Sequence, residues 1–271
     1  MSKPAFVLIG ADKGGVGKTT VSRTLIDYLR KKKIQVRAFD TESPRGTLKR
    51  FYPDLTEVVD ATQVHNQVKM FDDSADLANT VTVLDIRAGL LSKMLDTLRD
   101  VGFLDFANRG HLNLVVLHIL GPSIASLDEI SGTAKALGDA NYILVKNFIN
   151  DTTFFEWQPE TYSHYFETIK AAKEMVIPKL NELASENVEL AHVPYSQFVA
   201  DRTADGGAGA YSFVLRGYVR HWLAQVWSEY DRLNLADMLS DPSSRNASAE
   251  ERQYRAEAQR AEAQRAEAGA A

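Results

Sequence analysis

Short apolar runs alternate with longer amphipathic stretches along most of the chain. The runs are nearly uniformly apolar, which is typical of strands that are buried on both faces of a parallel sheet. The segments between them are long enough for the helices that connect parallel strands. We therefore expect strands at residues 5–10, 34–39, 81–84, 114–120, 142–145 and 188–193.

This alternation predicts an α/β protein with a doubly wound, mostly parallel sheet flanked by helices. Val21, Leu25 and Leu29 recur at helical spacing after the first strand, so a helix is expected there. A longer helix is expected from residue 212 to about residue 233, with a wide apolar side that packs on the sheet. We expect residues 1–239 to form one domain.

The composition changes abruptly after this domain. Residues 240–271 end in tandem Ala-Glu-Ala-Gln-Arg units, which are strong helix formers without a broad apolar stripe. Such a segment can neither join a core nor insert into a bilayer. We expect a low-complexity tail that is mobile or transiently helical.

Composition narrows the possible functions. The 271 residues are 45% apolar and 25% charged, which is typical of a globular protein with a sizeable core. Cysteine is absent, which excludes disulfides, Cys-ligated zinc, iron–sulfur clusters and thiol nucleophiles. No stretch reaches the roughly 18 apolar residues of a membrane span. A cytoplasmic protein without membrane insertion is expected.

Residues 10–20, Gly-Ala-Asp-Lys-Gly-Gly-Val-Gly-Lys-Thr-Thr, lie between the first strand and the first helix. The glycines allow backbone N–H groups to surround phosphate oxygens without Cβ clashes. The helix that begins near Lys18 directs the positive end of its dipole at the same anion. Lys18 then reaches the β- and γ-phosphates, and the Thr19 hydroxyl is a ligand for Mg²⁺. The sequence therefore predicts a phosphate-binding loop, the P-loop.

Residues 13–20 resemble the deviant Walker A motif of the ParA/MinD family of ATPases, whose distinguishing feature is an additional lysine, here Lys13. The resemblance extends over residues 4 to about 233 and implies ATP and Mg²⁺ as cofactors. It also implies that Lys13 crosses to the nucleotide of a second subunit, so that ATP is enclosed in a homodimer. The residues that it places on the nucleotide are Gly14, Gly15, Val16, Gly17, Lys18, Thr19 and Thr20.

Two further segments resemble switch segments of this family. Residues 40–46, Asp-Thr-Glu-Ser-Pro-Arg-Gly, are similar to switch I, and residues 85–89, Asp-Ile-Arg-Ala-Gly, are similar to switch II. Carboxylates at the carboxyl ends of parallel strands face the P-loop, so Asp40 and Asp85 are expected to hold Mg²⁺ through its waters, beside Thr19.

Switch I departs from the family pattern, because Glu42 replaces its second Asp and Ser43 is inserted after it. The group expected to orient the attacking water is therefore longer and differently placed, and we expect slow hydrolysis that a partner stimulates. The residues expected to act in catalysis are Lys13, Lys18, Asp40 and Glu42.

Two later positions carry a fainter resemblance. The family places an Asn, here Asn147, against the adenine edge, and the backbone of a segment that includes Pro194 lines the base. From the residues alone, Asn147 can equally cap a loop and Pro194 can end a strand. The acidic and histidine side chains within residues 156–167 favour a solvated helix face over a metal site, because Pro159 interrupts the segment.

The resemblance implies an ATP-dependent dimer that positions or partitions a plasmid or chromosome by binding DNA non-specifically, and an adaptor protein that stimulates hydrolysis. With 31 basic and 36 acidic residues the formal charge is −5, so DNA requires a local basic patch. The candidates for it are Lys49, Arg50, Arg202, Arg216 and Arg220. A protein that binds DNA in this way would be associated with the nucleoid.

Two alternatives remain open on the sequence. One is a ParA-like accessory of conjugation or of the positioning of a polar protein complex. The other is a small-molecule ATP-dependent ligase of the related P-loop group, which has no need for Lys13.

Overall fold

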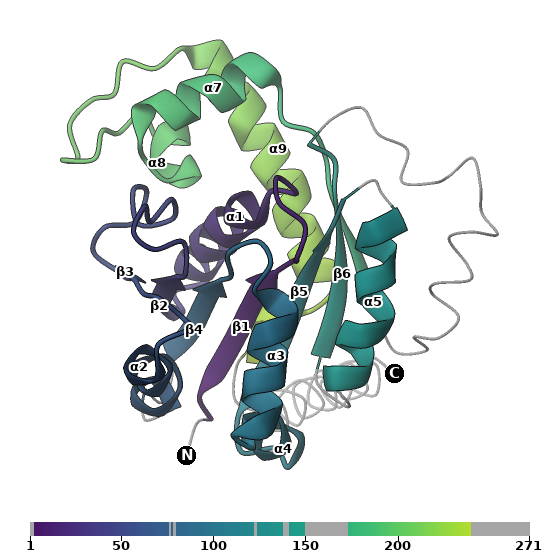
Figure 1. The fold of residues 1–271 in the computed structure, drawn as a ribbon. Helices are drawn as coiled ribbons and strands as arrows, with labels where there is room; N and C mark the ends of the chain where they lie inside the picture. Colours follow the sequence, from purple (N-terminus) through teal and green to yellow (C-terminus); the bar gives the residue numbers. More distant parts are fainter. Residues whose placement is uncertain are drawn as a thin grey trace, which may run out of the picture.

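The computed structural model describes residues 3–75, 77, 80–121, 124–137, 141–149 and 173–239. Within them, seven parallel strands form one sheet in the order β3-β2-β4-β1-β5-β6-β7, with helices on both faces (Figure 1). The predicted doubly wound α/β fold is confirmed. The expected tail at 240–271 and the acidic segment at 156–167 lie outside the described residues.

The strands and helices alternate in the predicted way. The strands are β1 (Ala5–Gly10), β2 (Gln35–Asp40), β3 (Thr56–Val58), β4 (Thr80–Asp85), β5 (Asn113–Leu120), β6 (Asn141–Asn147) and β7 (Lys173–Ile177). The helices are α1 (Lys18–Lys31), α2 (Val64–Ala75), α3 (Leu91–Asp100), α4 (Phe103–Asn108), α5 (Ile124–Leu137), α7 (Glu182–Ala191), α8 (Tyr195–Val199), α9 (Phe213–Arg232) and α10 (Leu235–Leu239). The first five predicted strands are all present, and their ends differ from the predicted ones by two residues or less.

Two apolar cores lie on the two faces of the sheet. Successive side chains of a strand point to opposite faces, so Val7 and Ile9 of β1 join one core and Phe6 and Leu8 join the other. The first core includes α1, α7, α8, α9 and α10, and the second includes α2, α3, α4 and α5. Figure 1 shows α3 and α5 on one side of the sheet and α1 and α9 on the other.

The strand register brings three strand ends together at one edge of the sheet. Asp85, the last residue of β4, pairs with Ile9 of β1 and with Asp40, the last residue of β2. The P-loop leaves the sheet one residue after Ile9, at Gly10. Both carboxylates therefore lie beside the beginning of α1.

The strand predicted at residues 188–193 is wrong, because these residues lie in α7 and the turn that follows it. The Asn181 side chain caps this helix by accepting a hydrogen bond from the Ala184 backbone N–H at 3.1 Å. Val188 is fully buried whereas Leu190 is 78% exposed, which is helical and not strand periodicity.

The two strands that the sequence did not predict lie at the two edges of the sheet. β3 has only three residues, and β7 alternates buried and exposed positions that include a lysine and a glutamate. Neither forms the uniformly apolar run by which the inner strands are found, because an edge strand has one side open to water.

The predicted long helix is present as α9. Ser212 begins it, and its hydroxyl oxygen accepts a hydrogen bond from the Leu215 backbone N–H at 3.4 Å. Tyr230 on this helix is buried against Tyr28 of α1, and Trp222 is buried against Tyr195 of α8. None of the helices in the described part of the chain has the length and apolar character needed to cross a membrane.

The helical assignment of residues 188–191 predicts unequal costs for two substitutions. Val188→Ala removes buried methyl groups and should lower the free energy of unfolding by about 2 kcal/mol. Leu190→Ala removes an exposed side chain and should change it by less than about 0.5 kcal/mol. Urea denaturation measures both values. In a strand the two side chains share a face, so equal losses would contradict the helix.

Candidate functional site

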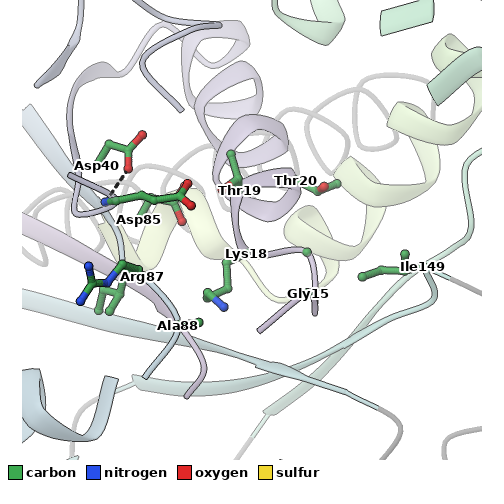
Figure 2. A pocket seen from close by; sticks show the side chains of 12 residues that line it. Gly15, Lys18, Thr19, Thr20, Asp40, Asp85, Arg87, Ala88 and Ile149 are labelled. Carbon is green, nitrogen blue, oxygen red and sulfur yellow. Dashed lines mark hydrogen bonds between the residues drawn. The ribbon is translucent and has the colours of Figure 1, made fainter. Parts of the chain in front are cut away.

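A cavity of about 420 Å³ opens where β1, β2 and β4 end (Figure 2). Figure 2 shows Asp40 and Asp85 side by side, with Thr19 and Lys18 next to them and Ile149 at the far end of the cavity from Arg87. The lining residues are Gly15, Gly17, Lys18, Thr19, Thr20, Asp40, Glu42, Asp85, Ile86, Arg87, Ala88 and Ile149.

Glycine is required at two positions of the P-loop. Gly15 and Gly17 have φ angles of 74° and 88°, which side chains rarely tolerate. A Cβ on Gly17 would lie 2.1 Å from Nδ2 of Asn147. The loop therefore bends tightly at these residues and keeps its backbone exposed toward the cavity.

The first turn of α1 presents a positive end to the cavity. Gly17 precedes the helix without a capping side chain, and the first turn carries no acidic residue. The first N–H groups of a helix have no partner within the helix, and they attract an anion. A phosphate group fits this position.

Lys18 is held at the centre of the loop. Its ammonium donates a hydrogen bond to the Lys13 carbonyl oxygen at 2.9 Å. Burial lowers the pKa of Lys18, and the negative charges of Asp85, Glu129 and other acidic groups oppose that change. A phosphate oxygen would supply the close anionic partner that this desolvated ammonium favours.

Asp40 and Asp85 place two buried carboxylates next to each other, with exposures of 1% and 4%. Burial raises the pKa of Asp40, although its oxygens accept hydrogen bonds from the backbone N–H groups of Glu42 at 2.9 Å and Leu48 at 2.6 Å. Burial, followed by the charge of Asp40, raises the pKa of Asp85 to about 7. Hydroxyl hydrogen bonds from Thr19 and Ser22 act in the opposite direction.

A divalent cation would relieve this repulsion. Mg²⁺ prefers oxygen ligands, takes one or two carboxylates and retains several waters. The pair Asp40 and Asp85, with the Thr19 hydroxyl beside them, fits that preference. No group of three or more His, Cys, Asp or Glu side chains in the described ranges forms an alternative metal cluster.

Thr41 joins the two switch segments. Its backbone N–H and its hydroxyl both donate to the Asp85 carbonyl oxygen, at 3.0 and 3.1 Å, and its hydroxyl accepts from the Arg87 N–H at 2.8 Å. Glu42 lines the cavity, and its carboxylate accepts a hydrogen bond from the Thr47 hydroxyl of the same loop. A shift in one switch segment therefore acts directly on the other.

Eight predicted residues line the cavity, and five others do not: Lys13, Gly14, Val16, Asn147 and Pro194. Lys13 is exposed, and its aliphatic carbons lie against Gly121. Asn147 is buried beneath the loop, where its amide donates to the Val16 carbonyl oxygen at 2.9 Å. Pro194 borders a different cavity together with Phe51, so the structure does not bring it to the P-loop.

Four lining residues are not among the site residues expected from the sequence: Ile86, Arg87, Ala88 and Ile149. Ile149 lies two residues beyond β6, is 43% exposed and offers an apolar contact at the open end of the cavity. An exposed isoleucine after a strand has no distinctive sequence signal. Its place in the lining of the cavity follows only from the packing of the end of β6 near the P-loop.

Comparison with known protein families assigns residues 7–187 to the model described as the CobQ/CobB/MinD/ParA nucleotide binding domain. This match contains the P-loop and both switch segments. A search of curated proteins finds no significant match to the sequence.

Several solved structures are similar to the chain at low sequence identity. A ParA family ATPase from Chlorobium tepidum TLS is 15% identical, with 82% of this chain and 98% of that chain covered and a TM-score of 0.45. The septum site-determining protein MinD from Pyrococcus horikoshii OT3, complexed with Mg-ADP, is 17% identical, with 82% and 98% covered and a TM-score of 0.45. The MinD cell division protein of Aquifex aeolicus is 15% identical, with 81% and 97% covered and the same TM-score of 0.45.

Asp85→Asn should remove part of the pH dependence of the stability of the nucleotide-free protein. The folded chain holds a proton on Asp85 up to about pH 7, whereas the unfolded chain releases it near the ordinary pKa of 3.8. The folded state therefore binds more protons between these values. The stability that this proton contributes is fully present below pH 3.8 and is lost as the pH rises through about 7.

Urea denaturation at about pH 5 and about pH 8 compares the two proteins. The wild type should lose more stability over this interval than Asp85→Asn does. Equal losses would contradict a buried, protonated Asp85 beside Asp40.

Proposed function

We infer that the chain is an ATP-dependent molecular switch, because it belongs to the CobQ/CobB/MinD/ParA nucleotide-binding family and has buried carboxylates beside a P-loop. Lys18, Asp40 and Asp85 converge on one cavity, and this convergence supports the binding of a phosphate together with a metal ion. ATP is the ligand that we propose for this cavity, with Mg²⁺ bound beside Thr19.

Different groups of the chain bind the phosphates and orient the metal ion. The N–H groups of the loop and of the first turn of α1 bind phosphate oxygens, and Lys18 supplies a fixed positive charge. Asp40 and Asp85 orient the waters of Mg²⁺, which when bound neutralises phosphate charge. Ile149 provides an apolar contact for the remainder of the nucleotide at the open end.

We propose that Glu42 orients the attacking water during slow hydrolysis of ATP to ADP and phosphate. Its carboxylate is already engaged by Thr47, so it must share that hydrogen bond or exchange it to reach a water. Basal turnover should lie well below the usual enzymatic range of about 1–10³ s⁻¹. An adaptor protein that moves the loop carrying Glu42 would accelerate the reaction.

The dimer proposed here depends on Lys13. This residue is exposed at the rim of the loop, while Lys18 occupies the cavity of its own chain. An ammonium directed at the nucleotide of a second subunit is a contact that exists only in the dimer. ATP would therefore shift the equilibrium from monomer to dimer through its differential contacts with the two states.

Lys13→Ala should retain nucleotide binding but fail to dimerise, because it removes the contact between subunits and leaves the cavity lining intact. Size-exclusion chromatography with a non-hydrolysable ATP analogue and Mg²⁺ measures the dimer, and calorimetry measures the nucleotide affinity. Lys33→Ala, an exposed lysine at the far end of α1, is the control. A Lys13→Ala protein that dimerises as the wild type does would rule out this shared site.

The proposed cargo is DNA, held by a basic surface that the dimer doubles. Two sequence candidates for this surface are engaged within the chain: Arg50 pairs with Glu189 at 3.1 Å and Arg216 with Asp201 at 3.7 Å. Arg220 instead lines a cavity of about 470 Å³ between α1, α8 and α9, together with Arg30 and Lys31. We therefore place the surface at this cavity.

The basic charge of this cavity is not offset by close ion pairs. Within the described ranges, none of its three cations lies within ion-pair distance of a carboxylate. Asp27 also lines the cavity, but its oxygens accept hydrogen bonds from the Ser196 N–H at 2.8 Å and the Ser196 hydroxyl at 3.0 Å. Burial raises the pKa of Asp27, which further weakens it as a counter-charge. The cavity can therefore attract a phosphodiester backbone.

The double variant Arg30→Ala, Arg220→Ala should bind random-sequence duplex DNA more weakly in the ATP state. Each phosphate that the variant no longer neutralises should reduce the slope of log K against log salt by about 0.9. Gel shifts at several salt concentrations, with ATP, ADP or no nucleotide, measure this slope. Arg99→Ala is the control, since Arg99 pairs with Asp96 on α3.

Absence of DNA binding in every nucleotide state at low salt would contradict the proposed cargo. The switch would then act on a protein complex, as an accessory of conjugation or of polar positioning does. A fluorescent fusion located across the nucleoid supports the DNA cargo, and a purely polar location supports the protein complex.

A further inference from the structure

Asp12, the residue before Lys13, joins the P-loop to two other elements. Its carbonyl oxygen accepts a hydrogen bond from the Gly89 N–H of switch II at 2.8 Å. Its carboxylate accepts from both the N–H and the hydroxyl of Ser92 on α3. Its own N–H donates to a carboxylate oxygen of Glu129 on α5 at 2.9 Å. The backbone at Asp12 is therefore fixed from both sides.

Glu129 is itself held by a buried polar chain. The same oxygen that accepts from Asp12 lies 3.3 Å from Nε2 of His118, which is fully buried on β5. Nδ1 of His118 lies 2.6 Å from the Tyr142 hydroxyl on β6. Burial raises the pKa of Tyr142, so its hydroxyl stays protonated and forms a hydrogen bond with Nδ1. Glu129 is therefore connected to β5 and β6 through the His118 imidazole.

Asp12 directly precedes Lys13, so the backbone position of Asp12 determines the direction in which the Lys13 side chain points. Lys13 has its carbonyl oxygen bonded to the Lys18 ammonium, while its side chain extends past Gly121. The loop residues that line the cavity begin at Gly15, and Asn147 supports them separately through the Val16 carbonyl oxygen. Glu129 and Ser92 therefore hold Asp12, whereas Asn147 holds the part of the loop that lines the cavity, and the Lys13 carbonyl links the two parts through Lys18.

We propose that Glu129 is a positioning residue that aims Lys13 at the second subunit and couples this direction to switch II through Asp12. This role rests on the proposed ATP-dependent dimer. The hydrogen bond that the Asp12 N–H donates to Glu129 fixes the Ala11–Asp12 peptide. The bond that the Asp12 carbonyl oxygen accepts from Gly89 fixes the next peptide, immediately before Lys13, and connects it to the segment that follows Asp85. Loss of Glu129 should then weaken dimerisation more than nucleotide binding.

Glu129→Ala removes both acceptor oxygens, whereas Glu129→Gln keeps one oxygen that can accept from the Asp12 N–H. Ser92→Ala removes a hydroxyl contact to Asp12 at an exposed position, so it tests the junction without disturbing a core. Asp128→Ala, one residue earlier on α5, is the control for removal of an exposed carboxylate.

Two quantities are measured for each protein with Mg²⁺: the affinity for ADP by calorimetry, and the dimer dissociation constant in a non-hydrolysable ATP analogue by analytical ultracentrifugation. Glu129→Ala should weaken the dimer about tenfold, as expected when a hydrogen bond to a charged acceptor is removed. Its affinity for ADP should stay within about twofold of the wild type. Glu129→Gln should restore most of the dimer, and Ser92→Ala should weaken it in the same direction.

Equal losses of dimer and of ADP affinity in Glu129→Ala would overturn the proposal, because they indicate a general support of the fold. An unchanged dimer in both Glu129→Ala and Ser92→Ala would also overturn it. If Glu129→Ala does not fold, the other two variants test the proposal: Ser92→Ala should weaken the dimer, Glu129→Gln should keep most of it, and an unchanged dimer in Ser92→Ala would overturn the proposal. A wild-type protein that stays monomeric in the ATP analogue would instead contradict the proposed dimer itself.

Discussion

Two carboxyl groups that repel each other when both are ionised are buried side by side at the centre of the site. The register of β2 and β4 places Asp40 opposite Asp85, and both lie where β1 turns into the P-loop. Burial raises the pKa of both carboxyl groups, so the nucleotide-free site favours a proton on Asp85. A divalent cation beside a phosphate removes this repulsion. The positive end of α1 and the Lys18 ammonium complete a site that favours a phosphate with its metal ion.

The inner part of the fold could be predicted because it follows from short-range patterns. Uniformly apolar runs are found where both faces of a strand are covered, as in β1 and β5. The edge strands β3 and β7 lack this pattern, and the end of α7 resembles a strand in the sequence because its apolar residues are few and closely spaced. Val188 and Leu190 illustrate the difficulty: only the packing of the helix on the sheet shows that one is buried and the other exposed.

The part of the site that lies at strand ends could also be predicted from the sequence, whereas the part that depends on packing could not. Lys18, Thr19, Asp40 and Asp85 follow strand ends and a glycine loop, so the topology alone brings them together. Asn147 and Pro194 depended on a resemblance, and the structure places one beneath the loop and the other in a separate cavity. The junction of Asp12 with Glu129 had no sequence signal, because 117 residues separate its partners and the hydrogen bond depends on how α5 packs.

This cavity should bind a nucleotide through Lys18. Calorimetry measures Mg-ATP binding to the wild type and to Lys18→Ala, with Lys93→Ala on the exposed side of α3 as the control. The wild type and the control should bind one nucleotide per chain, whereas Lys18→Ala should bind none. Equal affinity in the wild type and in Lys18→Ala would show that the nucleotide, if bound, lies elsewhere.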